Sequence, residues 1–124
     1  MVVLGNGRLD GGERALRVVT SLDSRPTAAF CYNDMTAIGL ISTARKAGLS
    51  VPQDLAVVGF DDIPFAAHID PPLTTIAQTP RDMGRQAMNM ALALMTTKDT
   101  ATPFSDISVK GKLIVRESSE RKAV

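Results

Sequence analysis

Two polar pairs occupy equivalent places in the first half of the chain and could bind a hydroxylated ligand. Asn33 and Asp34 follow one short apolar run, and Asp61 and Asp62 follow a second. A carboxylate accepts hydrogen bonds from sugar hydroxyls, whereas an asparagine amide both donates and accepts. No nucleophile with a base accompanies them, so the pattern favours binding without turnover. An alternative stays open, in which the first pair only caps a helix and the second only forms a turn.

Other residues that could support catalysis or metal binding lack partners at the required spacing. His68 is the only histidine and has no acidic or hydroxyl residue at triad or metal-ligand spacing. Cys31 lies inside an apolar run, where a packed thiol is expected rather than a nucleophile. Asp61 and Asp62 diverge as neighbours at a strand end, and no further carboxylate cluster supports a metal. We therefore expect no catalytic residue, no metal site and no cofactor.

A glycine-rich turn near the N-terminus is similar to a dinucleotide-binding fingerprint. Gly5, Gly7 and Gly11 lie between a short apolar run and a predicted helix. The fingerprint has the spacing G-x-G-x-x-G, and here the last glycine comes one position late. Asp10 also places a carboxylate where pyrophosphate would bind. A turn without a ligand is the favoured interpretation, and a nucleotide-dependent enzyme is the alternative.

A predicted βαβ unit positions the two polar pairs. Residues 27–32 and 55–60 are apolar throughout, as is typical of strands in a parallel sheet with helices on both faces. Residues 35–47 between them have helical spacing. Because the carboxyl ends of parallel strands meet at one edge, Asn33 and Asp61 are expected to lie close together there. The expected fold class is α/β, similar to a Rossmann fold.

Capping residues and turns predict the remaining elements. Asp34 is the expected N-cap of the 35–47 helix, and Gly48 the left-handed residue that ends it. The other expected elements are the end of a strand at 2–4, a helix from about 10 to 22, a helical turn at 63–69, a strand at 73–77, a helix at 80–96, a loop at 97–106 and extended pieces at 107–109 and 113–116.

Composition limits the class of protein. The 124 residues carry a formal net charge of +1 and suffice for one domain. The near-neutral charge argues against nucleic-acid binding by this segment, because phosphate contacts need clustered Lys and Arg. No window is apolar for long enough to span a membrane, and no secretory signal is visible. The single cysteine fits a reducing cytoplasm.

Six segments together resemble the C-terminal half of lac/galactose-repressor family transcription regulators. They cover nearly the whole chain in order: 26–30 (PTAAF), 33–39 (NDMTAIG), 47–54 (AGLSVPQD), 57–64 (VVGFDDIP), 70–76 (DPPLTTI) with Gln78, and 113–118 (LIVRES). The resemblance implies a periplasmic-binding-protein-like effector domain and a cytoplasmic homodimer. It also implies that a small molecule, a sugar or a nucleobase, controls operator binding.

The resemblance implies roles for individual residues. Asn33 and Asp61 match positions that contact the effector, and Gln78 matches a residue at the crossover between the two lobes. The predicted dimer interface lies on the helix that holds Ile38 and on the segment after the second strand. Its members are Ile38, Ile41, Phe65, His68 and Ile69.

The sequence departs from the family pattern at its N-terminal side. The family has a helix-turn-helix, a hinge and a first lobe before this point, so operator DNA would be bound only through that missing domain. We expect residues 1–117 to be effector domain, with 80–108 matching the missing lobe, and 118–124 to be a flexible tail. The wide apolar arc of the 80–96 helix is then expected to pack on a partner chain, to fold onto its own sheet or to be disordered.

Two other functions stay open. One is a transport-type sugar-binding protein of the same architecture, which an upstream signal peptide would favour and an upstream helix-turn-helix would exclude. The other is the nucleotide-dependent enzyme that uses the glycine-rich turn. The residues that would choose between sugars and nucleobases lie largely on the absent lobe.

Overall fold

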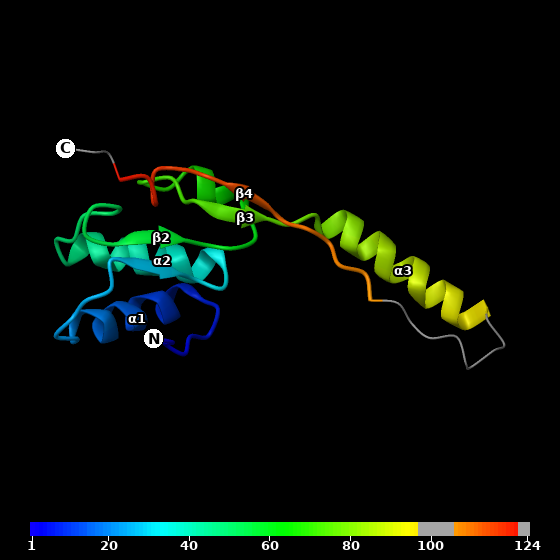
Figure 1. Ribbon diagram of the computed structural model, residues 1–124, viewed down its shortest axis with the longest axis horizontal. Helices are drawn as coiled ribbons and strands as arrows, with labels where there is room; N and C mark the ends of the chain where they lie inside the picture. Colours follow the sequence, from blue (N-terminus) through cyan, green and yellow to red (C-terminus); the bar gives the residue numbers. More distant parts are fainter. Residues whose placement is uncertain (97–105, 122–124) are drawn as a thin grey trace. The chain divides into compact units, whose positions relative to one another are not determined.

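The computed structural model describes residues 1–96 and 106–121 and confirms the α/β class. The chain forms two compact units, one of Met1–Ala77 with Lys112–Val124 and one of Gln78–Gly111. The second unit overlaps the segment that the resemblance assigns to the other lobe. The elements follow in the order α1 (Leu9–Thr20), β1 (Ala28–Phe30), α2 (Asp34–Lys46), β2 (Ala56–Val58), the 3-10 turn η1 (Pro64–Ala67), β3 (Thr75–Ala77), α3 (Pro80–Thr96) and β4 (Lys112–Ile114) (Figure 1).

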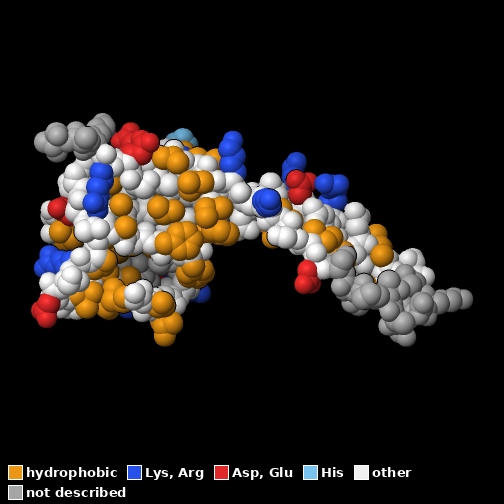
Figure 2. Space-filling model, viewed as in Figure 1, with side chains coloured by type: hydrophobic (Ala, Val, Ile, Leu, Met, Phe, Trp, Pro, Cys, Tyr) orange, Lys and Arg blue, Asp and Glu red, His pale blue; other side chains and the backbone are white. Residues whose placement is uncertain are grey.

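The predicted βαβ unit is present. Strands β1 and β2 pair in parallel with Ala29 opposite Val57, and α2 connects them. Burial alternates along β1 and beyond it, because Cys31 faces the core while Phe30 and Tyr32 are exposed. In this chain the helical layer therefore covers one face of β1. Figure 2 shows apolar side chains gathered on the visible face of the first unit.

Helices α1 and α2 cross at two glycines. A Cβ on Gly12 would lie 2.1 Å from the carbonyl oxygen of Thr36, and one on Gly39 would lie 2.0 Å from that of Leu9. The absence of both side chains lets the backbones touch, and α1 packs against α2 more extensively than any other pair of elements does (Figure 1). Leu16 of α1 joins the core through this contact.

Helix α2 has a well-formed end at each terminus. The prediction that Asp34 is the N-cap was wrong, because Asn33 caps the helix and its Oδ1 accepts a hydrogen bond from the Thr36 amide (2.9 Å). Asp34 is the first helical residue and is fully buried. At the other end Gly48 has φ +79°, and the Leu49 amide donates to the Ala44 carbonyl, as predicted for a left-handed stop.

The C-terminal segment completes the first unit by crossing β2 and β3. Strands β3 and β4 pair antiparallel, and the Val57 amide of β2 donates to the carbonyl of Ser118 (2.8 Å). Ser118, which we assigned to a flexible tail, is fully buried. Its hydroxyl donates to the Val57 carbonyl (2.6 Å) and accepts from the Thr74 amide (2.8 Å). The core around this crossing includes Ile41, Val57 and Leu73.

The structure differs from the sequence predictions at residues 2–4 and in the packing of the 80–96 helix, and it does not describe most of the predicted 97–106 loop. Residues 2–4 are not a strand, because no neighbouring strand pairs with them among the described residues, and Val2 and Leu4 are almost fully exposed. Helix α3 forms over the predicted range, yet none of its residues is buried. Of the three alternatives for α3, disorder is wrong because the helix forms, and packing on its own sheet or on a partner chain stays a prediction. Most of the loop expected at 97–106 lies outside the described residues.

Candidate functional site

The two polar pairs lie at adjoining strand ends. The amide of Asp34 donates to the carbonyl of Phe60 (2.9 Å), which joins the residue after Asn33 to the residue before Asp61. The structure thus brings Asn33 and Asp61 to the same edge of the parallel strand pair, as the spacing predicts.

Asn33 has structural partners for both atoms of its amide. Its Oδ1 caps α2 through the Thr36 amide, and its Nδ2 donates to the Gly7 carbonyl (3.0 Å). The amide therefore holds the N-terminal turn against the start of α2. One Nδ2 hydrogen and one Oδ1 lone pair remain beyond these two bonds. Exposed Tyr32 lies beside the same turn, because a Cβ on Gly7 would fall 1.9 Å from its hydroxyl.

Asp61 is exposed and has an unusual backbone conformation. Its φ is +118° and that of Asp62 is +52°. Aspartate tolerates the left-handed region, in which the φ of Asp62 falls. The φ of Asp61 lies outside that region, at a value that is normally adopted by glycine. The Asp61 amide donates to the Ile76 carbonyl (2.9 Å), so the strained residue is fixed against β3. Strain of this kind persists only where surrounding structure enforces it, and it concentrates at functional sites.

A network of hydrogen bonds and one ion pair, largely buried, fixes both strand ends. The carboxylate of Asp34 accepts from the Thr75 hydroxyl and from the Ile63 amide (2.9 Å). The Thr75 hydroxyl also lies 3.4 Å from the Asp62 amide. Asp62 pairs with Arg116 (2.8 Å), and these two side chains are 27% and 19% exposed. The residues next to Asn33 and Asp61 are therefore held by one connected set of contacts.

Sequence reasoning missed the structural roles of Thr75 and Arg116. Arg116 also donates to the Leu73 carbonyl (2.8 Å), so it fixes the strand that leads to Thr75. A signal was present, since the segment 113–118 contributes to the family resemblance. The sequence alone assigns Arg116 to an extended piece and Ser118 to a flexible tail, because their partners lie more than forty positions earlier in the chain.

The thiol of Cys31 is packed, as predicted. Its side chain is 8% exposed, and it belongs to the core cluster. Burial, and secondarily the negative charge of Asp34, raises the pKa of the Cys31 thiol to about 11. A thiol in this state is a poor nucleophile at neutral pH.

Three of the predicted dimer-interface residues line one hollow of the first unit. Ile38, Ile41 and Ile69 are on the wall of a cavity of about 580 Å³. The rest of its lining is Ser42, Arg45, Lys46 and Asp70. Phe65 and His68 are exposed. Ile41 is only 2% exposed and belongs to the core, so the prediction that it forms part of an interface is not supported, and it lies beneath this surface. The remaining exposed or half-buried apolar side chains beside a charged rim fit a protein-binding surface.

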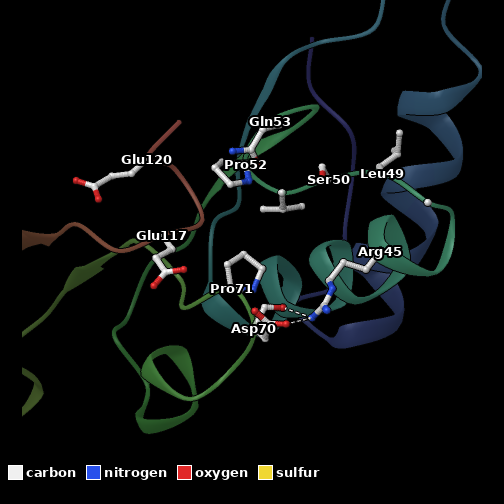
Figure 3. Close-up of a pocket in the computed structure, with 11 residues that line it drawn as sticks. Arg45, Leu49, Ser50, Pro52, Gln53, Asp70, Pro71, Glu117 and Glu120 are labelled. Atoms are coloured by element: carbon white, nitrogen blue, oxygen red, sulfur yellow. Dashed lines mark hydrogen bonds and ion pairs between the residues drawn. The ribbon is translucent and has the colours of Figure 1, made fainter. Parts of the chain in front are cut away.

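A second hollow of about 450 Å³ opens beside the turn that follows α2 (Figure 3). Pro52 and Pro71 lie on its wall, Glu117 and Glu120 lie on one side, and Arg45 pairs with Asp70 (2.7 Å) on the other. Neither hollow includes Asn33 or Asp61 in its lining.

Gln78 lies in the second unit, so it is described apart from the strand ends. Its predicted contact with an effector stays a prediction. Within the described residues there is no group of three or more His, Cys, Asp or Glu that could hold a metal ion. No helix in the same part of the chain has the length and apolar character needed to cross a membrane.

The glycine-rich turn is occupied by its own side chains. Asn6 Nδ2 donates to both carboxylate oxygens of Asp10 (3.0 and 3.1 Å), and Asn6 Oδ1 accepts from the Arg8 amide (3.2 Å). A Cβ on Gly11 would lie 2.3 Å from that same oxygen. Asn6 therefore fills the place at the start of α1 that a phosphate would need.

Comparison with known proteins agrees with this geometry. Residues 4–119 match the family described as a periplasmic binding protein-like domain. The chain is 43% identical to the HTH-type transcriptional repressor PurR of Haemophilus influenzae over 110 residues. This match covers 88% of this chain and 32% of that protein.

Solved structures show the same likeness. The transcriptional regulator CelR–cellobiose complex superposes with a TM-score of 0.83 at 30% identity, over 93% of this chain and 35% of that one. A LacI family regulator from Enterococcus faecium with bound ribose gives a TM-score of 0.78 at 27% identity, over 93% and 41%.

These matches identify the class of protein. The chain belongs to the periplasmic binding protein-like family, and the resemblance to the lac/galactose-repressor regulators is confirmed. It spans about a third of the length of the curated relatives it matches.

Proposed function

We propose that this chain is part of the effector-binding and dimerisation region of a cytoplasmic DNA-binding transcriptional regulator, and that the effector is a sugar. The observation that carries the proposal is exposed Asp61, which its amide bond to Ile76 fixes at a strand end, beside Asn33 and in a strained backbone conformation. A carboxylate at this edge suits sugar hydroxyls, and open α/β sheets bind ligands outside the carboxyl ends of their strands. The relatives whose structures contain cellobiose and ribose support the sugar class.

Within this proposal Asp61 contributes more to binding than Asn33. A hydrogen bond to a charged carboxylate is roughly twice as strong as one to a neutral amide, and the Asn33 amide already makes two hydrogen bonds within the chain. Gln78 would complete the set from the second unit. We assign dimerisation to Ile38, Phe65, His68 and Ile69, on the surface that includes the 580 Å³ hollow, with Ile41 of the core beneath it. Operator DNA would be bound by a domain upstream of this chain.

Substitution of Asp61 tests the proposal because two properties should change in opposite directions. In the full-length protein, we expect Asp61→Ala to weaken sugar binding by about 1.5–3 kcal/mol, the scale of a charged hydrogen bond. In the present chain, Asp61→Gly should raise the free energy of unfolding by about 1 kcal/mol, because glycine adopts φ +118° without strain. A residue kept for binding at the expense of stability would show both effects.

A thermal-shift panel of ribose, cellobiose and nucleobases first selects a ligand. Calorimetry then measures the sugar affinity of Asp61→Ala, and urea denaturation measures the free energy of unfolding of Asp61→Gly. Asp23→Asn, which removes an exposed carboxylate from the 21–26 connection, is the matched control for both. Unchanged affinity in Asp61→Ala would refute the binding role. A nucleobase that binds while every sugar fails would replace the sugar assignment.

A transport-type sugar-binding protein of the same fold is the second candidate. The HTH-type name of the relative at 43% identity favours the regulator instead. The coding sequence immediately upstream distinguishes the two, since a helix-turn-helix supports the regulator and a signal peptide supports the transport protein. We propose no catalytic activity, and the occupied glycine-rich turn gives no support to a nucleotide-dependent enzyme.

A further inference from the structure

Tyr32 places an exposed aromatic ring at the strand-end site. It follows β1 closely, and its side chain is 60% exposed. Backbone hydrogen bonds to β2 flank Tyr32 and Asn33 on both sides, one from the amide of Cys31 (2.8 Å) and one from that of Asp34 (2.9 Å). The ring is therefore attached to the chain at the end of the strand pair, where Asp61 also lies.

A glycine in the N-terminal turn leaves room for the ring. A Cβ on Gly7 would lie 1.9 Å from the hydroxyl oxygen of Tyr32 and 3.1 Å from its Cζ. The same point lies 3.4 Å from Nδ2 of Asn33, so the tip of the ring and the amide are neighbours. A side chain at position 7 would displace the ring, and the φ of Gly7, +75°, is also one that glycine adopts without strain.

The side chains at this edge have complementary chemistry for a sugar. Asn33 and Asp61 offer polar atoms to hydroxyls, and Tyr32 adds a flat apolar ring with a polar tip. A cyclic sugar has hydroxyls around its edge and C–H bonds on its faces. Ligand sites combine aromatic side chains with a few placed polar groups in this way. Tyrosine also supplies a large contact area at a low cost in side-chain freedom.

We propose, on the basis of the function proposed above, that Tyr32 is a further ligand contact. Its ring packs against a C–H face of the sugar while Asn33 and Asp61 bind hydroxyls at the edge of that sugar. The ring then selects cyclic sugars over open-chain polyols, which carry similar hydroxyls but present no flat face. Phe30 is also exposed (64%), but it lies two residues earlier, inside β1, and has no part in this contact.

Calorimetry of the full-length protein with cellobiose and with ribose tests the contact. Tyr32→Ala should weaken sugar binding about tenfold, the scale of the apolar surface that one stacked ring covers. Tyr32→Phe keeps the ring and should weaken binding less than about threefold. Phe30→Ala is the matched control, because it removes an exposed aromatic ring from the same strand and should leave the affinity unchanged.

Two further measurements separate binding from packing. Urea denaturation should show a free energy of unfolding for Tyr32→Ala close to that of the parent protein, because the side chain is exposed. The present chain has no tryptophan, and Tyr32 is its only tyrosine, so its intrinsic fluorescence reports on this ring. We expect a saturable change in emission with cellobiose or ribose, and no such change with the open-chain polyol sorbitol.

The outcomes distinguish a failure of this inference from a failure of the proposed function. If Asp61→Ala weakens sugar binding and Tyr32→Ala does not, the sugar site stands and the ring contact is wrong. If neither variant changes the affinity, the sugar site itself is wrong. Lower stability of Tyr32→Ala with unchanged affinity would make Tyr32 a packing residue for the Gly7 turn. Equal losses of affinity in Tyr32→Phe and Tyr32→Ala would assign the role to the hydroxyl, which would also overturn the stacking.

Discussion

At the scale of single residues, neighbouring positions divide two tasks between them. Asn33 and Asp61 stand at the strand ends, while Asp34 and Asp62 turn inward and bind the chain itself. The sequence shows two equivalent polar pairs, but it does not show which member of each pair is buried. That depends on Thr75 and Arg116, which are distant in sequence. The division explains why the capping role fell to Asn33 instead of Asp34.

The raised pKa of Cys31 predicts a loss of stability in alkali. An unfolded cysteine has a pKa of about 8.5, and that of Cys31 in the folded chain is about 11. The folded state holds the thiol proton more tightly, so this contribution is complete below about pH 8.5 and is lost as the pH rises toward 11. The loss should reach about 3 kcal/mol at most.

Urea denaturation at a series of pH values measures this effect, with Cys31→Ala as the reference. Every other group is the same in the two proteins, so only the difference between their stability–pH slopes reports on the thiol. If the free energy of unfolding fell equally with pH above 8.5 in both proteins, burial would not raise the pKa of the Cys31 thiol, and the prediction would be wrong.

At the scale of elements, the close crossing of α1 and α2 depends on the absence of a side chain at two glycines. Gly12 and Gly39 let α1 and α2 approach until backbone faces backbone. Helix propensity alone would favour alanine at both places, since glycine is about 1 kcal/mol less favourable in a helix interior. The contact between helices reverses that preference.

Gly39→Ala should therefore destabilise the first unit by about 1–3 kcal/mol, as overpacking does in a tight core. Chemical denaturation measures the change. Gly84→Ala in α3 is the matched control, because no atom lies near its Cβ and the substitution should raise helix content. If Gly39→Ala were neutral or stabilising, α1 and α2 could separate without loss, which contradicts so close a crossing.

Local pattern predicted most elements because their signals are local. Apolar runs located β1 and β2, Gly48 located the end of α2, and Pro80 located the start of α3. Local pattern failed for residues 2–4, where an apolar run has no strand beside it in the described chain. The strand-end site was predicted only as an edge, because its strained backbone at Asp61 depends on β3 and the C-terminal segment.

At the scale of the whole molecule, the C-terminal segment closes the first unit. Ser118 binds Val57 and Thr74, and Arg121 donates to the carbonyls of Thr27 and Pro52. These contacts join elements that no local pattern relates. Since 78–111 forms a separate unit, the chain leaves the first unit after β3 and returns to it through β4.

A chain that ends after Val115 should therefore lose cooperative unfolding. It would lack four hydrogen bonds around Ser118, made with Val57, Pro72 and Thr74. Val57 and Thr74 are buried while this segment covers them, so its removal also opens the core beside them to water. Each hydrogen bond contributes about 0.5–1.5 kcal/mol, and with the exposed core the loss approaches a typical domain stability of about 5–15 kcal/mol.

Thermal and urea unfolding followed by circular dichroism measure the result. A chain that ends after Arg121 keeps every one of these bonds and should unfold like the full chain. Ser118→Ala gives an intermediate case, because it removes the two side-chain bonds, keeps the two backbone bonds and should cost about 2 kcal/mol. A cooperative transition in the shorter chain would mean that the first unit is held by its helix–strand core alone, and that the returning C-terminal segment only rests on it.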